Sequence, residues 1–123
     1  MILKKLVNIL EPNFVHTDER GNLTQLVRDG YKQVNVILCK KGTFRGGHYH
    51  RLNTEAFYVI SGKFKLTLEY SGSVEEYIFK ENDFFSIPEN VKHSFDYHED
   101  TILVSMYDRG VELDNGEKDI ILC

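Results

Sequence analysis

The chain has 123 residues, which is enough to bury one hydrophobic core but not two, so we expect a single domain. Its net charge is −4 and its basic residues are scattered, which excludes a nucleic-acid-binding protein because that function needs a concentrated basic surface. Eight Phe, seven Tyr and no Trp favour a small all-β fold lined by aromatic rings.

The two cysteines and the amino terminus indicate a cytoplasmic protein. Cys39 lies in an apolar run and Cys123 is the last residue, so they form no disulfide framework. Residues 1–10 contain no apolar stretch long enough for a signal peptide or a membrane span. We therefore expect a reducing compartment in which Cys39 is a packed core thiol.

Short strands separated by turn residues run through the whole chain. Residues 63–70 alternate polar and apolar side chains, as a half-buried strand does, and Ser71-Gly72-Ser73 turns the chain into the next strand. The expected strands are residues 23–27, 34–39, 56–60, 63–70, 74–79, 84–87, 94–97 and 102–107. No amphipathic helix is recognisable, so the pattern predicts a β-sandwich or barrel.

The segment between Gly42 and Gly62 contains the most informative residues. His48 and His50 are two positions apart, so their imidazoles leave the same face of an extended strand. Glu55, expected on the next strand, can supply an oxygen at the same point. This pattern predicts a metal site built into a strand pair.

A second motif begins at Pro88 and ends at His93. Between them, Asn90 occupies a turn position at which a left-handed backbone is tolerated by Asn better than by other non-glycine residues. If His93 points inward, Tyr97 leaves the same face of its strand, which makes it a candidate proton donor. Tyr49 and Tyr58 alternate away from the histidine face and are expected to pack elsewhere.

Both motifs resemble the two signatures of the cupin superfamily. The spacing Gly-x5-His-x-His-x4-Glu-x6-Gly matches the first signature, and the second is present with Asn90 in place of a glycine and Tyr97 in place of a later Asn. The resemblance implies an all-β, double-stranded β-helix (a jelly-roll or cupin barrel). It also implies a single cupin domain over residues 1–123, with signature regions 42–62 and 82–97.

His48, His50, Glu55 and His93 are the expected metal ligands. Three neutral imidazoles and a carboxylate form a mixed nitrogen and oxygen shell that suits a divalent transition ion: zinc, iron, manganese or nickel. Some sugar ketoisomerases and epimerases of the superfamily use the same region without a metal, with one histidine as the base, so a metal-free site is the alternative. His16 and His98 are expected at the surface.

Two arginine segments are similar to segments of nucleotide-sugar epimerases and ketoisomerases. Arg45 lies in Arg-Gly-Gly-His, and Arg20 lies in Asp-Glu-Arg-Gly-Asn-Leu. The resemblance implies that both arginines hold the phosphates of a nucleotide, Arg20 often across a dimer. The alternatives are a surface arginine for Arg45 and a hairpin loop with an exposed ion pair for Arg20.

Together with the predicted metal site, these resemblances imply a metal-binding cupin that epimerises or isomerises a keto-deoxy sugar on a nucleotide diphosphate in surface-polysaccharide biosynthesis. His48 and Tyr97 are the predicted catalytic residues. Residues 50–57 also resemble the zinc-binding cupin domain of some capsular-polysaccharide sugar reductases. A metal-dependent oxygenase or lyase and a non-catalytic sugar-binding cupin stay open as alternatives. We expect a homodimer, with the tail at residues 120–123 either joining the interface or closing the barrel.

Overall fold

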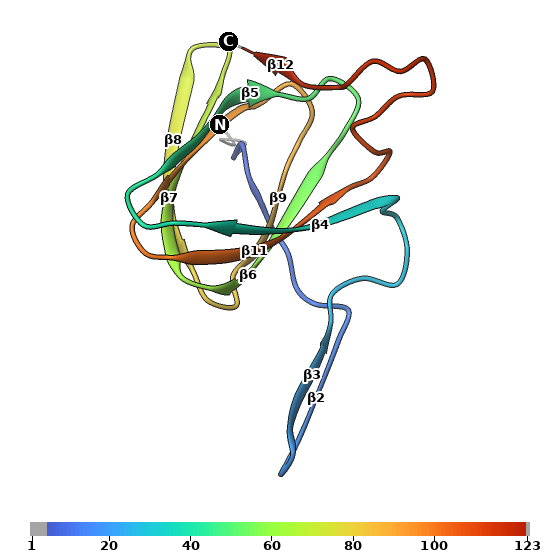
Figure 1. Cartoon of the computed structure of the whole chain (residues 1–123), viewed down its shortest axis with the longest axis vertical. Coiled ribbons are helices and arrows are strands. Elements are labelled where there is room, and N and C mark those ends of the chain that lie inside the picture. Colours follow the sequence, from blue (N-terminus) through green and yellow to red (C-terminus); the bar gives the residue numbers. More distant parts are fainter. Residues whose placement is uncertain (1–4, 123) are drawn as a thin grey trace.

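A computed structural model describes residues 5–122 and shows two antiparallel five-stranded sheets with a separate hairpin (Figure 1). The first sheet has the order β1 (Asn8–Ile9), β9 (Phe84–Ile87), β6 (Glu55–Ser61), β11 (Thr101–Tyr107), β4 (Gln33–Cys39). The second has the order β12 (Ile121–Leu122), β5 (Phe44–Tyr49), β10 (Lys92–Tyr97), β7 (Lys63–Tyr70), β8 (Ser73–Lys80). The hairpin consists of β2 (Phe14–Asp18) and β3 (Gly21–Gln25) and stands away from the barrel.

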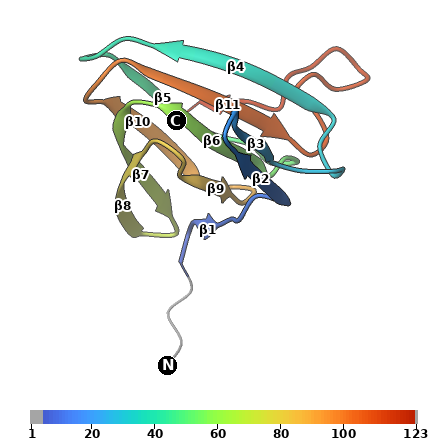
Figure 2. The same cartoon turned by 90° about the horizontal axis from the view of Figure 1, so that it is seen from below.

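The two sheets face each other and enclose an aromatic core (Figure 2). β7 shows why the chain folds this way, because its alternate residues Phe64, Leu66 and Leu68 are fully buried while the residues between them are not. Phe85 stacks on Phe79 with ring centroids 4.1 Å apart. Alternation on both sheets therefore creates an apolar interior between them, to which these rings contribute.

The predicted strands are all present, and their ends differ from the expected ends by at most two residues. Phe14–Asp18 and the two short strands Asn8–Ile9 and Ile121–Leu122 were not expected, because their side chains do not alternate over a long enough stretch. Residues 5–122 contain no helix, and the double-stranded β-barrel of the cupin type is confirmed. That the domain extends over all of residues 1–123 stays a prediction.

The structure also tests the expectations for the Asn90 turn, the cysteines and a membrane span. Asn90 adopts a φ of 68°, so it does occupy the left-handed turn position before β10. Cys39 is buried, as expected of a core thiol, whereas Cys123 lies outside the described residues. In the described part of the chain, no helix has the length and apolar character needed to cross a membrane.

Candidate functional site

Three imidazoles and one carboxylate meet inside the barrel, and they come from three strands and the residue that follows one of them. His48 lies near the end of β5, His50 follows that strand directly, Glu55 begins β6 and His93 lies on β10. One nitrogen from each histidine lies within 4.8 Å of the nitrogens of the other two. The structure thus brings the four predicted ligands together.

The polar side-chain atoms of the four residues lie close to one another. His93 Nε2 lies 3.2 Å from His48 Nε2, and His50 Nε2 lies 3.0 Å from Glu55 Oε1. Glu55 Oε1 also lies 3.6 Å from His93 Nε2, so this oxygen faces two imidazoles at once. Only His48 is partly exposed; His50, Glu55 and His93 are 3%, 4% and 1% exposed, so the approach to the cluster is on the His48 side.

The far nitrogens of two imidazoles are fixed by backbone carbonyl groups. His50 Nδ1 donates to the carbonyl oxygen of Asp119 at 2.6 Å, and His93 Nδ1 donates to that of Val91 at 3.1 Å. A carbonyl oxygen can only accept, so both Nδ1 atoms carry a proton and both Nε2 atoms point into the cluster. Ser105 Oγ donates to Glu55 Oε2 at 2.5 Å and so holds the carboxylate from its other side.

Burial and the neighbouring charges set the protonation of the cluster. Burial lowers the pKa of His93 to about 4, and burial together with the adjacent His50 lowers the pKa of His48. Burial would also lower the pKa of His50, but its hydrogen bonds to Glu55 and Asp119 outweigh burial and raise it. Burial would raise the pKa of Glu55, but hydrogen bonds from His50 and Ser105 and the charge of His93 keep that pKa below its ordinary value.

The cluster fits a divalent transition ion. With metal to ligand distances of about 2.1 Å, neighbouring ligand atoms are about 3.0 to 3.4 Å apart in octahedral or tetrahedral geometry. Two separations in the cluster, 3.2 and 3.0 Å, lie within that range, and a third, 3.6 Å, is slightly longer. Imidazoles that donate Nδ1 to a carbonyl group and present Nε2 inward are the usual arrangement of histidine ligands.

A glycine allows β5 and β10 to approach each other beside the cluster. The register between the strands shifts between His93 and Ser94, and Gly46, paired with Ser94, has a φ of 118°. A Cβ atom built on Gly46 would lie 2.5 Å from the carbonyl oxygen of His93. Only glycine therefore permits the close contact that brings His48 next to His93.

Arg45 and Arg20 lie in different places. Arg45 is paired with the inward-facing Phe95 across β5 and β10, and directly opposite residues leave the same face of a sheet, so Arg45 leaves β5 on the barrel side, but the residue is exposed. No described carboxylate lies within ion-pair distance of Arg45. Arg20 instead lies in the turn of the β2–β3 hairpin, where its Nη2 is 2.7 Å from Asp18 Oδ2. Within one chain the two arginines do not form a common site.

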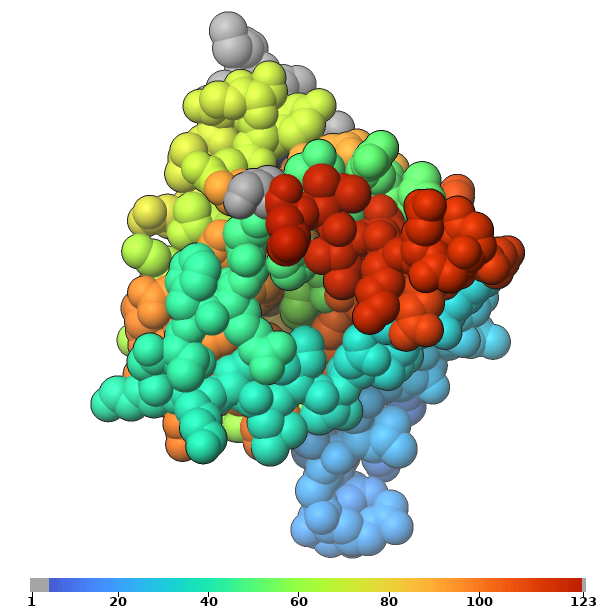
Figure 3. All heavy atoms as spheres, turned by 45° about the horizontal axis from the view of Figure 1, so that its top comes forward, coloured from blue at the N-terminus to red at the C-terminus, as the bar shows by residue number. Residues whose placement is uncertain are grey.

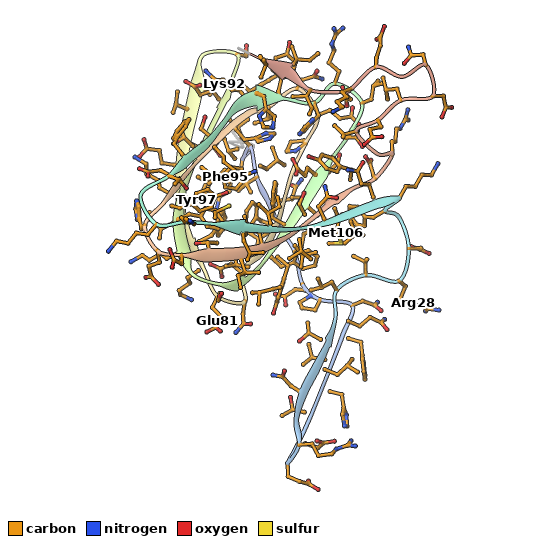
Figure 4. The ribbon with its side chains drawn as sticks, in the orientation of Figure 1. Arg28, Glu81, Lys92, Phe95, Tyr97 and Met106 are labelled. Carbon is orange, nitrogen blue, oxygen red and sulfur yellow. The ribbon has the colours of Figure 1, made fainter. Side chains whose placement is uncertain are left out.

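Tyr97 faces the interior as predicted, but it is 2% exposed and packs deep in the core. Figure 4 shows Phe95 and Tyr97 inside the barrel and Lys92 at the far end of the same strand. Burial and a hydrogen bond with Cys39 raise the pKa of Tyr97, which makes it a weak proton donor. Tyr107 is the phenol beside the cluster, with its ring centroid 5.2 Å from that of His50; burial and the Glu55 charge raise its pKa as well.

The remaining expectations concern surface residues and access. His16 and His98 are exposed near Asp18 and Asp96, so they lie outside the cluster, as expected. Tyr58 packs outside the barrel core and its hydroxyl donates to Asn82. Figure 3 shows a hollow between the β4 and β5 segment and the C-terminal segment.

Sequence reasoning missed three polar residues that support the cluster: Ser105, Asn53 and Asp119. Ser105 could have been found, because it alternates with Leu103 and Tyr107 on the inward face of a correctly predicted strand. Asn53 and Asp119 carry no local pattern, since both lie in loops whose contacts are made by distant parts of the chain.

Three comparisons with known proteins bear on this arrangement. A family model described as the polysaccharide biosynthesis C-terminal domain matches residues 16–109. No curated protein sequence is significantly similar to the chain.

Solved structures of low sequence identity share the fold. The chain is 19% identical to a 3,4-ketoisomerase from Helicobacter canadensis, with a TM-score of 0.78 and coverage of 94% of this chain and 89% of that one. It is 20% identical to a dTDP-4-dehydrorhamnose 3,5-epimerase from Sulfolobus tokodaii, with a TM-score of 0.72 and coverage of 87% and 72%. It is 22% identical to the capsular polysaccharide assembling protein CapF from Staphylococcus aureus, with a TM-score of 0.66, and matches 89% of this chain but 33% of CapF.

The family model spans most of the chain and includes the strands that carry His48, His50, Glu55 and His93. The fold shared with the three structures is the cupin barrel expected from the two signatures. The chain therefore belongs to the polysaccharide biosynthesis C-terminal domain family and has the cupin fold.

Proposed function

We propose that the protein epimerises or isomerises a keto-deoxy sugar carried on a nucleotide diphosphate, in the biosynthesis of a polysaccharide. The observation that carries the proposal is the convergence of His48, His50, Glu55 and His93 in the barrel, with Arg45 leaving β5 on the barrel side. The family description and the names of the epimerase and ketoisomerase structures support it. A cytoplasmic location is part of the proposal.

Epimerisation or isomerisation next to a ketone needs a group that removes a proton from carbon and a group that stabilises the resulting enolate oxygen. His48 is the imidazole on the accessible side of the cluster, and its lowered pKa keeps it neutral at pH 7, so in the metal-free protein the ring nitrogen that carries no proton can accept one. The nitrogens of His50 are bonded to Asp119 and Glu55, and its raised pKa favours the positively charged form, which stabilises a nearby enolate oxygen electrostatically. The two imidazoles thereby supply the base and the positive charge that the reaction requires.

We also propose that His48, His50, Glu55 and His93 hold a divalent transition ion. When bound, such an ion supplies Lewis-acid polarisation of a substrate oxygen. Glu55 Oε1 is fixed by its two imidazole neighbours, and the Nε2 atoms of His50 and His93 are held inward by their Nδ1 bonds. A single Nε2 atom of His48 cannot be a ligand and a proton acceptor at the same time, so activity with and without metal separates these two roles.

Arg45 is the proposed contact for the diphosphate. Arg45 leaves β5 on the barrel side, is exposed, and is not neutralised by a described carboxylate. A planar guanidinium presents paired N–H donors that match the oxygens of a phosphate. The adjacent Gly46 and Gly47 leave room for a ligand to come close to the backbone.

A homodimer is the proposed assembly, because two surfaces formed by residues 5–122 expose apolar side chains. The outer face of β4, an edge strand, exposes Val34, Val36 and Leu38 at 60%, 63% and 70%. The hairpin that stands away from the barrel exposes Phe14 and Leu23 at 52% and 57%. A second copy would cover these apolar surfaces and would allow Arg20 to reach the neighbouring barrel.

Thermal denaturation with ligands tests the proposal. A dTDP- or UDP-sugar should raise the melting temperature at concentrations above its dissociation constant, whereas the free sugar should not. Arg45→Gln should abolish this shift, and Arg28→Gln, which removes an exposed arginine far from the cluster, should leave it unchanged. A melting temperature that responds to metal but to no nucleotide contradicts the proposed substrate class. Conversion of a dTDP-4-keto-6-deoxy sugar, followed by proton exchange in D₂O, then identifies the reaction with and without added metal.

A further inference from the structure

We infer that Asp119 is a positioning residue that fixes the orientation of the His50 imidazole, and that Asn53 fastens the same C-terminal segment at its other end. This inference rests on the proposed role of His50 in the site. It assigns a function to the segment at residues 110–119, which lies beyond the strands of the barrel core.

Asp119 makes a hydrogen bond with every polar group that it has. Its carbonyl oxygen accepts from His50 Nδ1 at 2.6 Å, and its N–H donates to the carbonyl oxygen of Val111 at 2.7 Å. Its carboxylate accepts from the N–H groups of Arg51 and Leu52 at 2.9 and 2.8 Å, and from Asn53 Nδ2 at 2.9 Å. The residue is 4% exposed, so these bonds are shielded from water.

These hydrogen bonds link Asp119 both to the His50 ring and to the residues that follow His50. Residues 51–53 follow His50 directly, and they hold the Asp119 side chain, whose own carbonyl oxygen returns to the His50 ring. The carboxylate thus fixes the position of the carbonyl group that holds Nδ1, which in turn directs Nε2 toward Glu55. A rotation of the imidazole would break the bond to Asp119 and the bond to Glu55 together.

Asn53 anchors the opposite end of the segment. Its Oδ1 accepts from the N–H groups of Arg109 and Gly110 at 3.0 and 2.9 Å, and its Nδ2 donates to the carbonyl oxygen of Gly110 at 3.0 Å. Asn53 is 1% exposed. The segment is therefore attached to the loop after His50 at both ends, although 66 positions separate Asn53 from Asp119.

The continuation of the segment also contacts the strand that carries His48. In β12, Leu122 pairs with His48 and Ile121 pairs with Tyr49, so the tail covers the edge of β5. The sequence left open whether this tail joins an interface or closes the barrel. Within the described residues it pairs with β5, and Asp119 couples that closure to the orientation of His50.

The test uses the full chain with Asp119→Ala, the similarly sized Asp119→Asn, and Glu117→Gln as a control. Glu117 is an exposed carboxylate of the same segment, and its side chain makes no hydrogen bond among the described residues. The first measurement is the ¹⁵N-edited spectrum of histidine ring N–H groups in metal-free protein. Wild type and Glu117→Gln should show a slowly exchanging His50 Nδ1–H signal, assigned by its loss in His50→Gln; both Asp119 variants should lose it or show rapid exchange.

The second measurement is the affinity for Co²⁺, followed by its visible absorption. Removal of a group that orients a ligand lowers metal affinity by about 10- to 100-fold, so Asp119→Ala should fall in that range, Asp119→Asn should lose less, and Glu117→Gln should bind as wild type does. The inference is wrong if both Asp119 variants keep the N–H signal and the Co²⁺ affinity of wild type. It is also wrong if the variants lose Co²⁺ affinity while the N–H signal stays unchanged.

The outcomes separate this inference from the proposed function. If wild type binds no Co²⁺, or converts no nucleotide sugar, the N–H signal alone decides the role of Asp119. Should Asp119→Ala fail to fold, which circular dichroism would show, Asp119→Asn decides it, because that variant keeps the volume and some of the acceptors of the carboxylate.

Discussion

His93 Nε2 lies 3.2 Å from His48 Nε2, although the two residues are 45 positions apart and come from neighbouring strands. His93 donates its Nδ1 proton to Val91, and its low pKa keeps it neutral, so its Nε2 presents a bare lone pair to His48. Two lone pairs at this distance repel each other unless a proton or a cation lies between them. The pair therefore needs either a proton on His48 Nε2 or a metal ion.

Glycine substitutions beside this pair should have unequal effects. Gly46→Ala would place a Cβ atom 2.5 Å from the carbonyl oxygen of His93, whereas Gly47→Ala meets no atom within 4 Å. Both glycines have positive φ, so both variants carry backbone strain, which costs about 1 to 2 kcal/mol per residue. We expect a larger loss of unfolding free energy for Gly46→Ala, together with weaker Co²⁺ binding. Urea denaturation measures the first, and equal losses in the two variants would show that the close approach is unimportant.

Glu55→Gln should weaken metal binding without unfolding the barrel. Glutamine keeps the shape of the side chain but loses the charge, and a neutral amide oxygen is a poorer ligand for a divalent ion. We expect Co²⁺ affinity to fall by more than about 100-fold, since even groups that only orient ligands contribute 10- to 100-fold. The matched control is Glu76→Gln, which removes an exposed carboxylate on β8 and should bind as wild type does. Equal affinity of Glu55→Gln and wild type would remove Glu55 from the ligand set.

The stability of the metal-free protein should fall between pH 7 and pH 5 because of His93. Burial lowers the pKa of His93 in the folded state to about 4 from 6.5, against the opposing charge of Glu55 and with the help of His48 and His50. The unfolded chain therefore binds a proton below pH 6.5 that the folded chain does not bind, and this favours unfolding as the pH falls. The loss attributable to His93 is about 2 kcal/mol by pH 5.

Urea denaturation at both pH values, with chelator present, checks this dependence in wild type and in His93→Gln. The variant should lack this component of the pH dependence, while contributions from His50 and Glu55 stay in both proteins. Parallel pH curves for the two proteins would mean that His93 titrates normally in the folded state.

A charge on the outer face of β4 should dissociate the proposed dimer. Val36→Glu places a carboxylate in the exposed apolar stripe, and burial of an unpaired charge against a second copy would cost several kcal/mol. Val74→Glu is the control, because Val74 is similarly exposed, at 57%, but lies on β8 in the other sheet. Light scattering after gel filtration should give a monomer for Val36→Glu and a dimer for Val74→Glu and wild type. A dimeric Val36→Glu would place the interface elsewhere, and a monomeric wild type would exclude the assembly.

The strands could be predicted because alternation is a local property. Phe64, Leu66 and Leu68 take every second position of β7, and the same period marks β10 and β11. The convergence of the polar groups could also be predicted, since the spacing of His48, His50 and Glu55 directs three side chains toward one place, whereas their role as metal ligands stays a prediction. The hairpin β2–β3 was only half recognised, because exposed strands lack a buried face to alternate against.

Tyr97 and Arg20 show where local patterns fail. Alternation placed Tyr97 on the inward face correctly, but it could not show that the phenol lies beside Cys39, away from the imidazoles. The resemblance places Arg20 at the nucleotide, often across a dimer; the hairpin holds Arg20 away from the barrel of its own chain, so this role stays a prediction. Depth along a strand and the direction of a hairpin depend on packing between distant elements, which a local pattern does not contain.

The sequence by itself determined the β-barrel, the two motifs and the four polar groups that converge, because strand period and ligand spacing act over a few residues. Only the tertiary structure decided how those groups are held: by Ser105 on Glu55, by the Gly46 contact between β5 and β10, and by Asp119 on His50. These contacts join residues up to 69 positions apart, and they exist only after the sheets have packed and the C-terminal segment has closed over the edge of β5.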